Sequence, residues 1–338
     1  MQTGKSWPMK IPCSIRLFAA FLASTAPAIA FDCAKSTTKV EKAICSDRNL
    51  GAADADMTNA YVAVRDVSNP SEKKMLVLSQ RRWIEQRESA CAYGEDAELT
   101  SCIVKETIER KLLLQGAPES GPGAASPLVP VFLRRVGTSK IYELDYALLR
   151  FANPQSAGEK LFNAQSRKIL SEAPVEPHGQ DEFEDRVLTR EETFAISYAS
   201  PDLLSVADSS YGNDGGAHGN GGVSNINIDM RSGREINTTD MFASETIKTL
   251  TLECREQILQ RKQGNDSAEK YVPEEDGNYQ ESTIADHIND FPRWTVLADK
   301  AIVTFDSYAI GAYAEGPYEC EFEMPKLKAL AKPDAPLP

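Results

Sequence analysis

Six of the seven cysteines constrain the fold of this chain more than any other feature of its sequence. They are Cys33, Cys45, Cys91, Cys102, Cys254 and Cys320. An even number of cysteines in an exported chain is typical of disulfide bonding, and the C-x-x-C spacing of zinc and redox sites is absent from the set. We expect two disulfides among the first four cysteines, whose three possible pairings stay open, and a third disulfide, Cys254–Cys320.

The expectation of export comes from the first thirty residues. Their positive charges are Lys5, Lys10 and Arg16. The apolar run from Leu17 to Ala30 is shorter than the roughly 20 residues that span a bilayer. It ends in the small-x-small pattern Ala28-Ile29-Ala30 that signal peptidase recognises. We predict cleavage after Ala30, removal of Cys13 with the signal, and a periplasmic or secreted mature protein without a transmembrane segment.

The acidity of the chain limits the partners that it can bind. Its formal charge is −13 and its pI is about 4.9. The signal holds three positive and no negative residues, so the mature chain carries −16. This charge argues against nucleic acid, which is bound through clustered Lys and Arg. It favours a cationic protein, because opposite net charges raise the rate of encounter.

A segment rich in Gly, Pro, Ala and Ser divides the chain into two parts. Gly116 to Ser126 has no periodic apolar positions and is typical of a flexible connector. The predicted organisation is a signal peptide (1–30), a helical module (31–115), a linker (116–128), an α+β domain (129–332) and a frayed tail (333–338).

The N-terminal module shows helical periodicity and recognisable helix starts. Ser36, Thr37 and Thr38 are candidate caps for a first helix from Val40 to Cys45, with Glu41 near the capping-box position. Asp47 and Asn69-Pro70 are expected to begin the next two helices, and Ser101 a fourth that runs through Leu114. The residues expected to face inward include Leu50, Met57, Ala60, Leu76, Trp83, Ile84, Val104, Thr107 and Ile108. A core of this size is marginal below ~70–80 residues, and disulfides are the usual supplement.

Several spaced residues of this module match a known pattern. They are Phe31-Asp32-Cys33, Val40-Glu41-Lys42-Ala43-Ile44-Cys45, Gln80-Arg81-x-Trp83-x-x-x-Arg87-x-x-x-Cys91, and Cys102 followed by Thr107, Arg110 and Leu114. With them, residues 31–114 resemble the LprI-type lysozyme-inhibitor N-terminal family. The resemblance implies a lysozyme-type partner. Trp83 is expected to anchor the core, and Arg87 is either a satisfied buried cation or a surface contact.

The C-terminal part is predicted to be an α+β domain with a mainly antiparallel sheet. Runs that alternate apolar and polar residues, such as Val223 to Asp229, indicate half-buried strands. The expected strands are 129–136, 140–151, 193–198, 203–211, 223–229, 294–297, 302–305 and 318–322, and the expected helices are 156–169, 244–262 and one that contains Leu327 and Leu330. The glycine-rich segment from Tyr211 to Gly222 is expected to be a loop. It lacks the Lys-Ser/Thr ending of a phosphate-binding loop.

This part also matches a known pattern. The residues are Ser209-x-Tyr211, Gly215-Gly216-Ala217-His218-x-Asn220, Ile226-Asn227-x-Asp229, Asp240-Met241-Phe242, and Phe305-Asp306-x-Tyr308-x-Ile310-x-x-Tyr313-Ala314-x-Gly316-Pro317. Over roughly 185–332 the chain resembles the C-terminal extracellular domain of the RsiV anti-sigma factor and PdaC-type deacetylases, with Ala312 where that family usually has proline. In RsiV this domain binds lysozyme, and in the deacetylases it is accessory to a separate catalytic domain.

The two loops that carry this pattern are the predicted partner-binding site. Tyrosines serve as rigid interface anchors, and glycines let a loop enter a cleft. The candidate residues are Tyr211, Gly215, Gly216, His218, Asn220, Tyr308, Tyr313 and Glu315. The alternative is that these residues shape a buried β-turn.

We expect no catalytic, cofactor or metal site. The three histidines, His178, His218 and His287, form neither an H-x-x-x-H motif nor a Cys/His ligand set. His218 with Asp214 has the composition of a base and its orienter, but only Ser209 and Ser210 are nearby nucleophiles. The prediction is a non-catalytic envelope protein that binds a lysozyme-type muramidase, as an inhibitor or as a sensor. The alternative is an accessory module that binds peptidoglycan glycan through its aromatic side chains.

Overall fold

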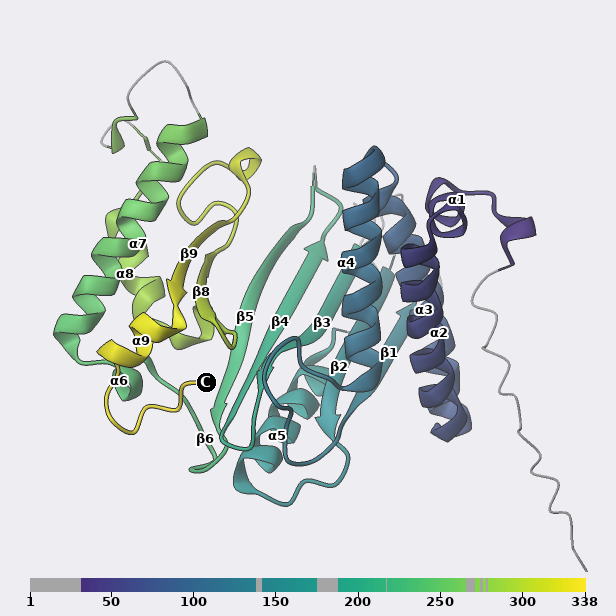
Figure 1. Ribbon diagram of the computed structural model, residues 1–338, viewed down its shortest axis with the longest axis horizontal. Coiled ribbons are helices and arrows are strands. Elements are labelled where there is room, and N and C mark those ends of the chain that lie inside the picture. The colour runs from purple at the N-terminus through teal and green to yellow at the C-terminus, as the bar shows by residue number, and fades with distance from the viewer. Residues whose placement is uncertain are drawn as a thin grey trace, which may run out of the picture.

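The structure, a computed structural model, describes residues 32–137, 142–174, 188–216, 218–265, 271–273, 276–277 and 279–338. It confirms the predicted α+β class and consists of a helical module, a six-stranded sheet and a smaller C-terminal part (Figure 1). The predicted export signal lies outside the described residues. None of the described helices is long and apolar enough to cross a membrane.

Local caps set where the helices of the N-terminal module begin. The helices are α1 (Lys39–Ser46), α2 (Arg48–Val67), α3 (Pro70–Cys91) and α4 (Asp96–Gln115). Thr38 and Asn69 each form a reciprocal capping box, with Glu41 and Glu72. The prediction that Ser101 opens the last helix is wrong, because α4 already begins at Asp96 after a cap residue without a side-chain hydrogen bond. No capping motif marks that start in the sequence.

The structure resolves the disulfide pairing that the sequence leaves open. Cys33 pairs with Cys45, and Cys91 pairs with Cys102. The first bridge ties a short 3-10 turn (Cys33–Lys35) to α1, and the second ties the end of α3 to α4. The third bridge, Cys254–Cys320, closes a sequence separation of 66 residues and lies fully buried in the C-terminal part.

A buried ion pair joins three helices of the module. Arg87 Nη1 donates to Asp54 Oδ1 at 2.9 Å and to Thr107 Oγ1 at 3.1 Å, and its guanidinium lies 4.5 Å from the Trp83 ring centroid. Arg87 is therefore a buried cation. Ile84 and Ile108, which we expected to face inward, are 42% and 41% exposed. The helices present another face to the core than we expected, because arginines occupy buried positions that a hydrophobic pattern does not predict.

The six-stranded sheet follows the order of its strands in the chain. They are β1 (Leu128–Val136), β2 (Tyr142–Phe151), β3 (Leu188–Ala199), β4 (Leu203–Asn213), β5 (Asn220–Asp229) and β6 (Arg234–Glu235). Only the β2–β3 pair is parallel, and the crossover between these two strands contains α5 (Ala157–Glu172). Phe162 of α5 packs against Phe151 and Phe194, so α5 covers one face of the sheet.

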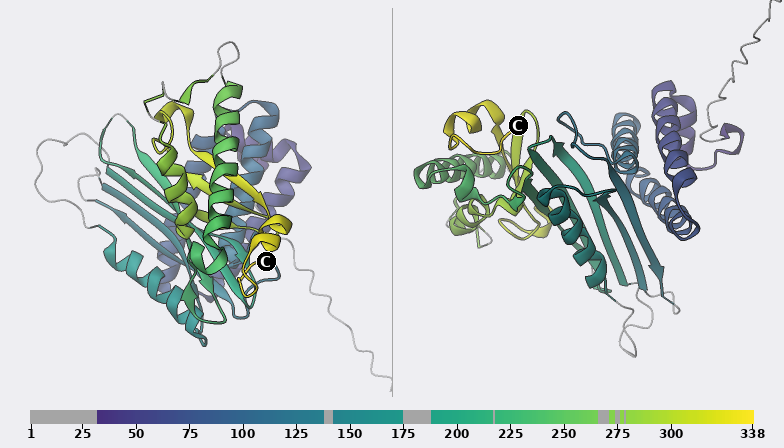
Figure 2. Two further views of the ribbon diagram at one scale, coloured as in Figure 1. Left: turned by 90° about the vertical axis from the view of Figure 1, so that its left-hand side faces the viewer. Right: turned by 90° about the horizontal axis from the view of Figure 1, so that it is seen from below.

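Both flanking parts of the protein pack on the opposite face. We call this the module face; it carries Asp145 of β2, Glu191 of β3, and Ser205 and Tyr211 of β4. Arg82 of α3 pairs with Glu191 at 2.8 Å, and the Val296 amide of the C-terminal part donates to Ser205 Oγ at 3.2 Å. Figures 1 and 2 show the sheet between the helical module and the C-terminal part.

The C-terminal part has a three-stranded sheet and a core of its own. Its elements are α6 (Thr238–Met241), α7 (Ser244–Asn265), α8 (Glu281–Asn289), η4 (Phe291–Arg293), β7 (Trp294–Val296), β8 (Lys300–Phe305), η5 (Tyr313–Glu315), β9 (Tyr318–Glu323) and α9 (Met324–Leu330). Trp294 stacks on Phe291 and Phe322 at its centre. Helix α8 is absent from the sequence-based expectation.

Two segments that we predicted to be loose are held in place. In the connecting segment, the Glu119 amide donates to Ile196 O at 2.8 Å and the Ser120 amide to Ser197 O at 3.1 Å. These bonds form because β2 pairs with β3 only as far as Thr193, which leaves the following carbonyls of β3 available. The tail is also anchored, since the Lys332 amide donates to Met241 O.

Arginines of the helical module meet carboxylates at its junction with the sheet. Arg110 of α4 lies with its guanidinium 5.0 Å from the Phe132 ring of β1. Asp145 is only 8% exposed beneath it, and one of its carboxylate oxygens has no partner among the described residues. Burial raises the pKa of Asp145 to about 6, against the opposing charges of Arg134 and Arg110.

Asp145→Asn tests this junction through the pH dependence of stability. The native pKa lies above the unfolded value near 4, so native Asp145 holds a proton at intermediate pH that the unfolded chain has released. Stability of the wild type relative to the variant should therefore fall by up to ~3 kcal/mol as pH rises from about 4 to about 7. Denaturant unfolding across this range measures the difference, and a constant difference would contradict the assigned shift.

Candidate partner-binding site

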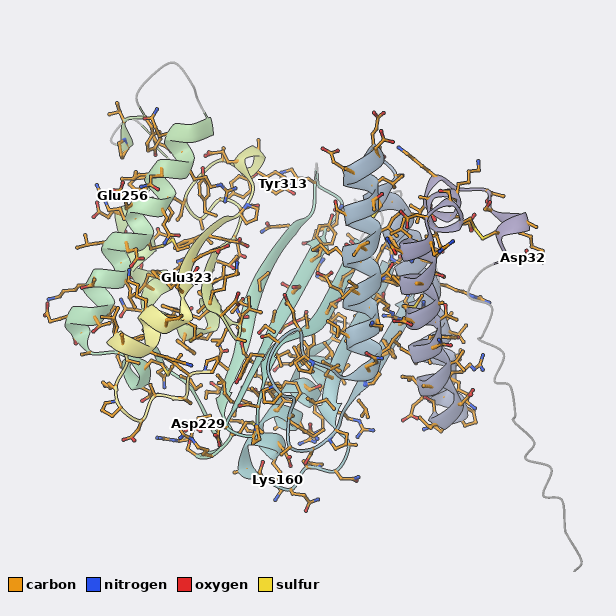
Figure 3. The ribbon with its side chains drawn as sticks, in the orientation of Figure 1. Asp32, Lys160, Asp229, Glu256, Tyr313 and Glu323 are labelled. Carbon is orange, nitrogen blue, oxygen red and sulfur yellow. A yellow bond between two sulfur atoms is a disulfide. The ribbon has the colours of Figure 1, made fainter. Side chains whose placement is uncertain are left out.

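The glycine-rich segment is mostly strand, not loop. β4 continues to Asn213 and β5 begins at Asn220, with Tyr211 paired to Gly221 and Gly212 to Asn220. The short turn between the strands contains Gly215 at φ +77°, a conformation that favours glycine, and the exposed Gly216. The loop after β8 lies beside this hairpin tip, and Tyr313 on it is labelled in Figure 3.

Three aromatic rings from the hairpin and the loop pack together. His218 stacks on Tyr313 with ring centroids 4.0 Å apart, and the Tyr308 ring lies 5.3 Å from that of Tyr313. His218 Nδ1 donates to Gly219 O at 2.9 Å, because a carbonyl oxygen only accepts. In the neutral ring Nε2 therefore accepts, from the Tyr308 hydroxyl at 3.3 Å. The Tyr313 hydroxyl also donates to Gly219 O, at 3.2 Å.

Tyr211 extends this cluster onto the module face. Its ring covers Gly219, where the Cβ of any other residue would overlap the ring. The exposed fractions of Tyr211, Tyr308 and Tyr313 are 40%, 55% and 37%. We call Tyr211, His218, Tyr308 and Tyr313 the aromatic surface. These four of the eight predicted residues come together at one place, exposed and already ordered.

An ion pair fixes the hairpin against the loop. Asp306, at the end of β8, accepts the Val223 amide at 3.0 Å through Oδ1 and pairs with Arg293 Nη1 at 2.6 Å through Oδ2. A Cβ at Gly222 would lie 2.8 Å from the Asp306 carboxylate, so glycine permits this close approach. The clamp places the Tyr308 loop next to the His218 turn.

Glu315 is exposed, but its carboxylate is engaged within the loop, so it is not a free contact residue. Its carboxylate accepts the Ala312 amide at 2.6 Å, the Tyr318 hydroxyl at 2.5 Å and Lys262 Nζ at 3.1 Å. Lys262 is buried and also bonds Asp276 at 2.8 Å. Burial opposes the charge of Lys262, but the hydrogen bonds to Asp276 and Glu315 outweigh it and raise the pKa of this lysine.

The other residues considered in the sequence analysis lie apart from the aromatic surface or have other partners. Asn220 is exposed at the start of β5. Asp214 pairs with Arg190 and not with His218, so the base-and-orienter arrangement is not formed. His287 stacks on Phe305, and burial lowers its pKa, while His178 lies outside the described residues. In the described ranges no group of three or more His, Cys, Asp or Glu is placed to hold a metal ion.

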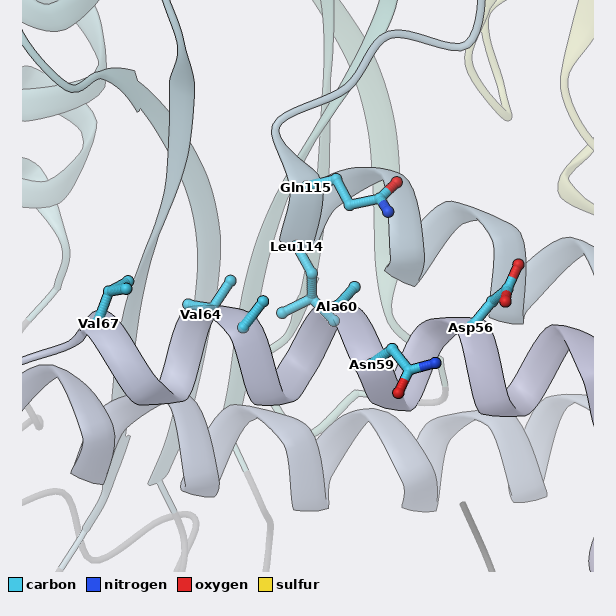
Figure 4. A pocket seen from close by; sticks show the side chains of 8 residues that line it. Asp56, Asn59, Ala60, Val64, Val67, Leu114 and Gln115 are labelled. Carbon is cyan, nitrogen blue, oxygen red and sulfur yellow. The ribbon is translucent and has the colours of Figure 1, made fainter. Parts of the chain in front are cut away.

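Several hollows of the described residues lie away from the aromatic surface. One of about 520 Å³ is lined by α2 and the end of α4, including Ala60, Val64 and Leu114 (Figure 4). Another of about 510 Å³ lies between α2, α3 and β1. A smaller hollow of about 220 Å³ lies between α4 and β3 on the module face. None of the predicted site residues lines any of these three.

An exposed, preordered group of aromatic side chains is the kind of surface through which proteins bind other molecules. Residues 33–114 match the model of a family described as "Lysozyme inhibitor LprI", which confirms the resemblance of the helical module. Residues 239–325 match a family described as a protein of unknown function (DUF3298), within the range of the second resemblance. Neither description assigns a catalytic activity. No curated protein matches the chain.

Two solved structures of DUF3298 proteins are similar to this chain. One, from Bacteroides fragilis NCTC 9343, is 13% identical, has a TM-score of 0.44, and covers 62% of this chain and 94% of its own. The other, from Pseudomonas aeruginosa PAO1, is 16% identical, has a TM-score of 0.43, and covers 62% of this chain and 95% of its own.

Lys262→Met tests whether the buried lysine holds the loop. The change leaves two carboxylates, whose side chains are 17% and 34% exposed, without their cation. Because solvent screens them in part, the free energy of unfolding should fall by ~2 kcal/mol. Hydrogen exchange at the Ala312 amide, which bonds Glu315, should speed up. Lys248→Met removes an exposed ion pair from the same helix and should change stability by less than ~0.5 kcal/mol. Equal effects of the two variants would contradict the role of Lys262.

Proposed function

We propose that this chain is an exported, non-catalytic protein that binds a lysozyme-type muramidase and inhibits it. The observation that carries the proposal is the match of residues 33–114 to a family described as a lysozyme inhibitor. The three disulfides support an oxidising compartment, periplasmic or extracellular. The aromatic surface supplies a rigid contact whose side chains lose little freedom on binding.

The distribution of charge supports a cationic partner. Residues 32–115 hold 13 Lys and Arg against 14 Asp and Glu, so the helical module is nearly neutral. Residues 116–338 hold 21 Lys and Arg against 36 Asp and Glu. The negative charge therefore lies almost wholly on the part that carries the aromatic surface. A cationic muramidase would be steered towards this part, and added salt would slow the association.

Tyr308→Ala and Tyr313→Ala test the aromatic surface as the contact. Each change removes an exposed anchor ring, and affinity for the muramidase should fall tenfold or more, or ~1.4 kcal/mol. Calorimetry with lysozymes of several classes, beside a muramidase activity assay, measures both binding and inhibition. Leu252→Ala, which removes an exposed apolar side chain from α7, is the matched control. Unchanged affinity in both tyrosine variants would exclude this surface as the contact.

The alternative function is binding of peptidoglycan glycan strands by an accessory module. The Tyr308 ring, which is 55% exposed, favours it, because aromatic faces also pack on sugar rings. Sedimentation with purified peptidoglycan distinguishes the two. Retention on peptidoglycan without saturable binding to any lysozyme would favour the glycan partner, and the reverse result would favour the muramidase.

A further inference from the structure

A strip of the module face is left open between α4 and the aromatic surface. Cross-strand neighbours on this face of β3 and β4 are Glu191 with Tyr211, Thr193 with Ser209, and Ala195 with Ala207. Thr193, Ala195 and Ser209 are exposed although they lie on central strands of the sheet. Figure 1 shows β3 and β4 between α4 and the three-stranded sheet. Because the side chains of Thr193, Ala195 and Ser209 are small, the strip is a shallow, open part of the sheet surface.

The hollow of about 220 Å³ lies at the α4 side of this strip. It is lined by Lys105, Ile108, Glu109, Leu112, Leu113, Glu119, Ala195 and Ile196. Aliphatic side chains of α4 and β3 form most of its wall. Two carboxylates, those of Glu109 and Glu119, also line it. Ile108 of α4 lines the hollow, and its side chain is 41% exposed.

The two carboxylates that line the hollow, those of Glu109 and Glu119, differ in their ion pairing. Glu109 pairs with Lys105 on the surface of α4 at 3.2 Å. Among the ion pairs of the described residues, none includes Glu119. The Glu119 amide donates to Ile196 O, so the backbone that carries this carboxylate is fixed beside the hollow. An exposed, anchored carboxylate next to an aliphatic wall suits a lysine or arginine side chain, whose stem packs on apolar surface while its head meets the charge.

The hollow and the aromatic surface are close enough for one partner to touch both. Ala195 and Glu191 are four residues apart on β3, which is about 13 Å, and Tyr211 lies directly opposite Glu191. A standard interface covers ~800 Å² of each protein, and a patch of that area is wider than this separation. We propose that the hollow between α4 and β3 is a second contact for the same cationic muramidase and receives a basic side chain from it. This inference rests on the proposed function.

Two single variants test the hollow in the full mature chain. Glu119→Gln removes the charge without changing size, and Ala195→Leu fills the hollow from an exposed position. Each should weaken binding of a cationic c-type lysozyme about tenfold in calorimetry at low salt. The Glu119→Gln effect should shrink at high salt, whereas the Ala195→Leu effect should persist. Glu245→Gln, which removes an exposed carboxylate on α7, is the matched control for net charge.

The same variants in the Tyr313→Ala background separate this inference from the proposed function. Contacts more than ~10 Å apart add independently, so Glu119→Gln should weaken the Tyr313→Ala protein by the same factor as the wild type. If Tyr313→Ala weakens binding while neither hollow variant does, or if Glu119→Gln has only the effect of Glu245→Gln, the hollow is not a contact and the proposed function stands. If the wild-type chain binds no lysozyme, both proposals fall.

Discussion

The rest of the structure depends on one polar face of the six-stranded sheet, to which both flanking parts are bound. On one side, arginines of α3 and α4 meet Glu191 and Asp145. On the other side, Asn227 Nδ2 donates to the carbonyls of Phe291 and Trp294. Buried polar contacts of this kind add little net stability, but they penalise any other orientation, because a shift would leave several groups unpaired. The polar face therefore determines how the flanking parts are oriented on the sheet more than how strongly they are held there.

The aromatic surface exists only because that docking is directional. Its rings come from two segments far apart in the chain, the hairpin of the large sheet and the loop of the C-terminal part. The Asp306 clamp lies between them and joins β5, the strand that also carries Asn227. A rotation of the C-terminal part would separate His218 from Tyr313 and expose the Gly219 carbonyl that both rings use. The geometry of the aromatic surface is thus built into the fold.

What the sequence could predict follows from how local each cause is. The capping boxes at Thr38 and Asn69 and the alternation from Val223 to Asp229 act within a few residues, and the elements that they predict are present. The inward arginines, the fixed connecting segment and the bond between Glu315 and Lys262 each depend on a partner far along the chain, so no local pattern could reveal them. Lys262 in particular has no distinguishing neighbour in the sequence.

The common face also affects how the two regions that match family models could bind partners. Two binding modules on a flexible linker gain affinity only through a raised effective concentration, and they can serve two partners. Here the connecting segment is hydrogen-bonded along β3, and the helical module and the aromatic surface adjoin one strip of sheet. A rigid arrangement loses no linker entropy on binding but accepts only a partner whose surface matches both regions at their fixed separation. If the proposed function holds, the geometry therefore favours one partner bound by both parts over two partners bound separately.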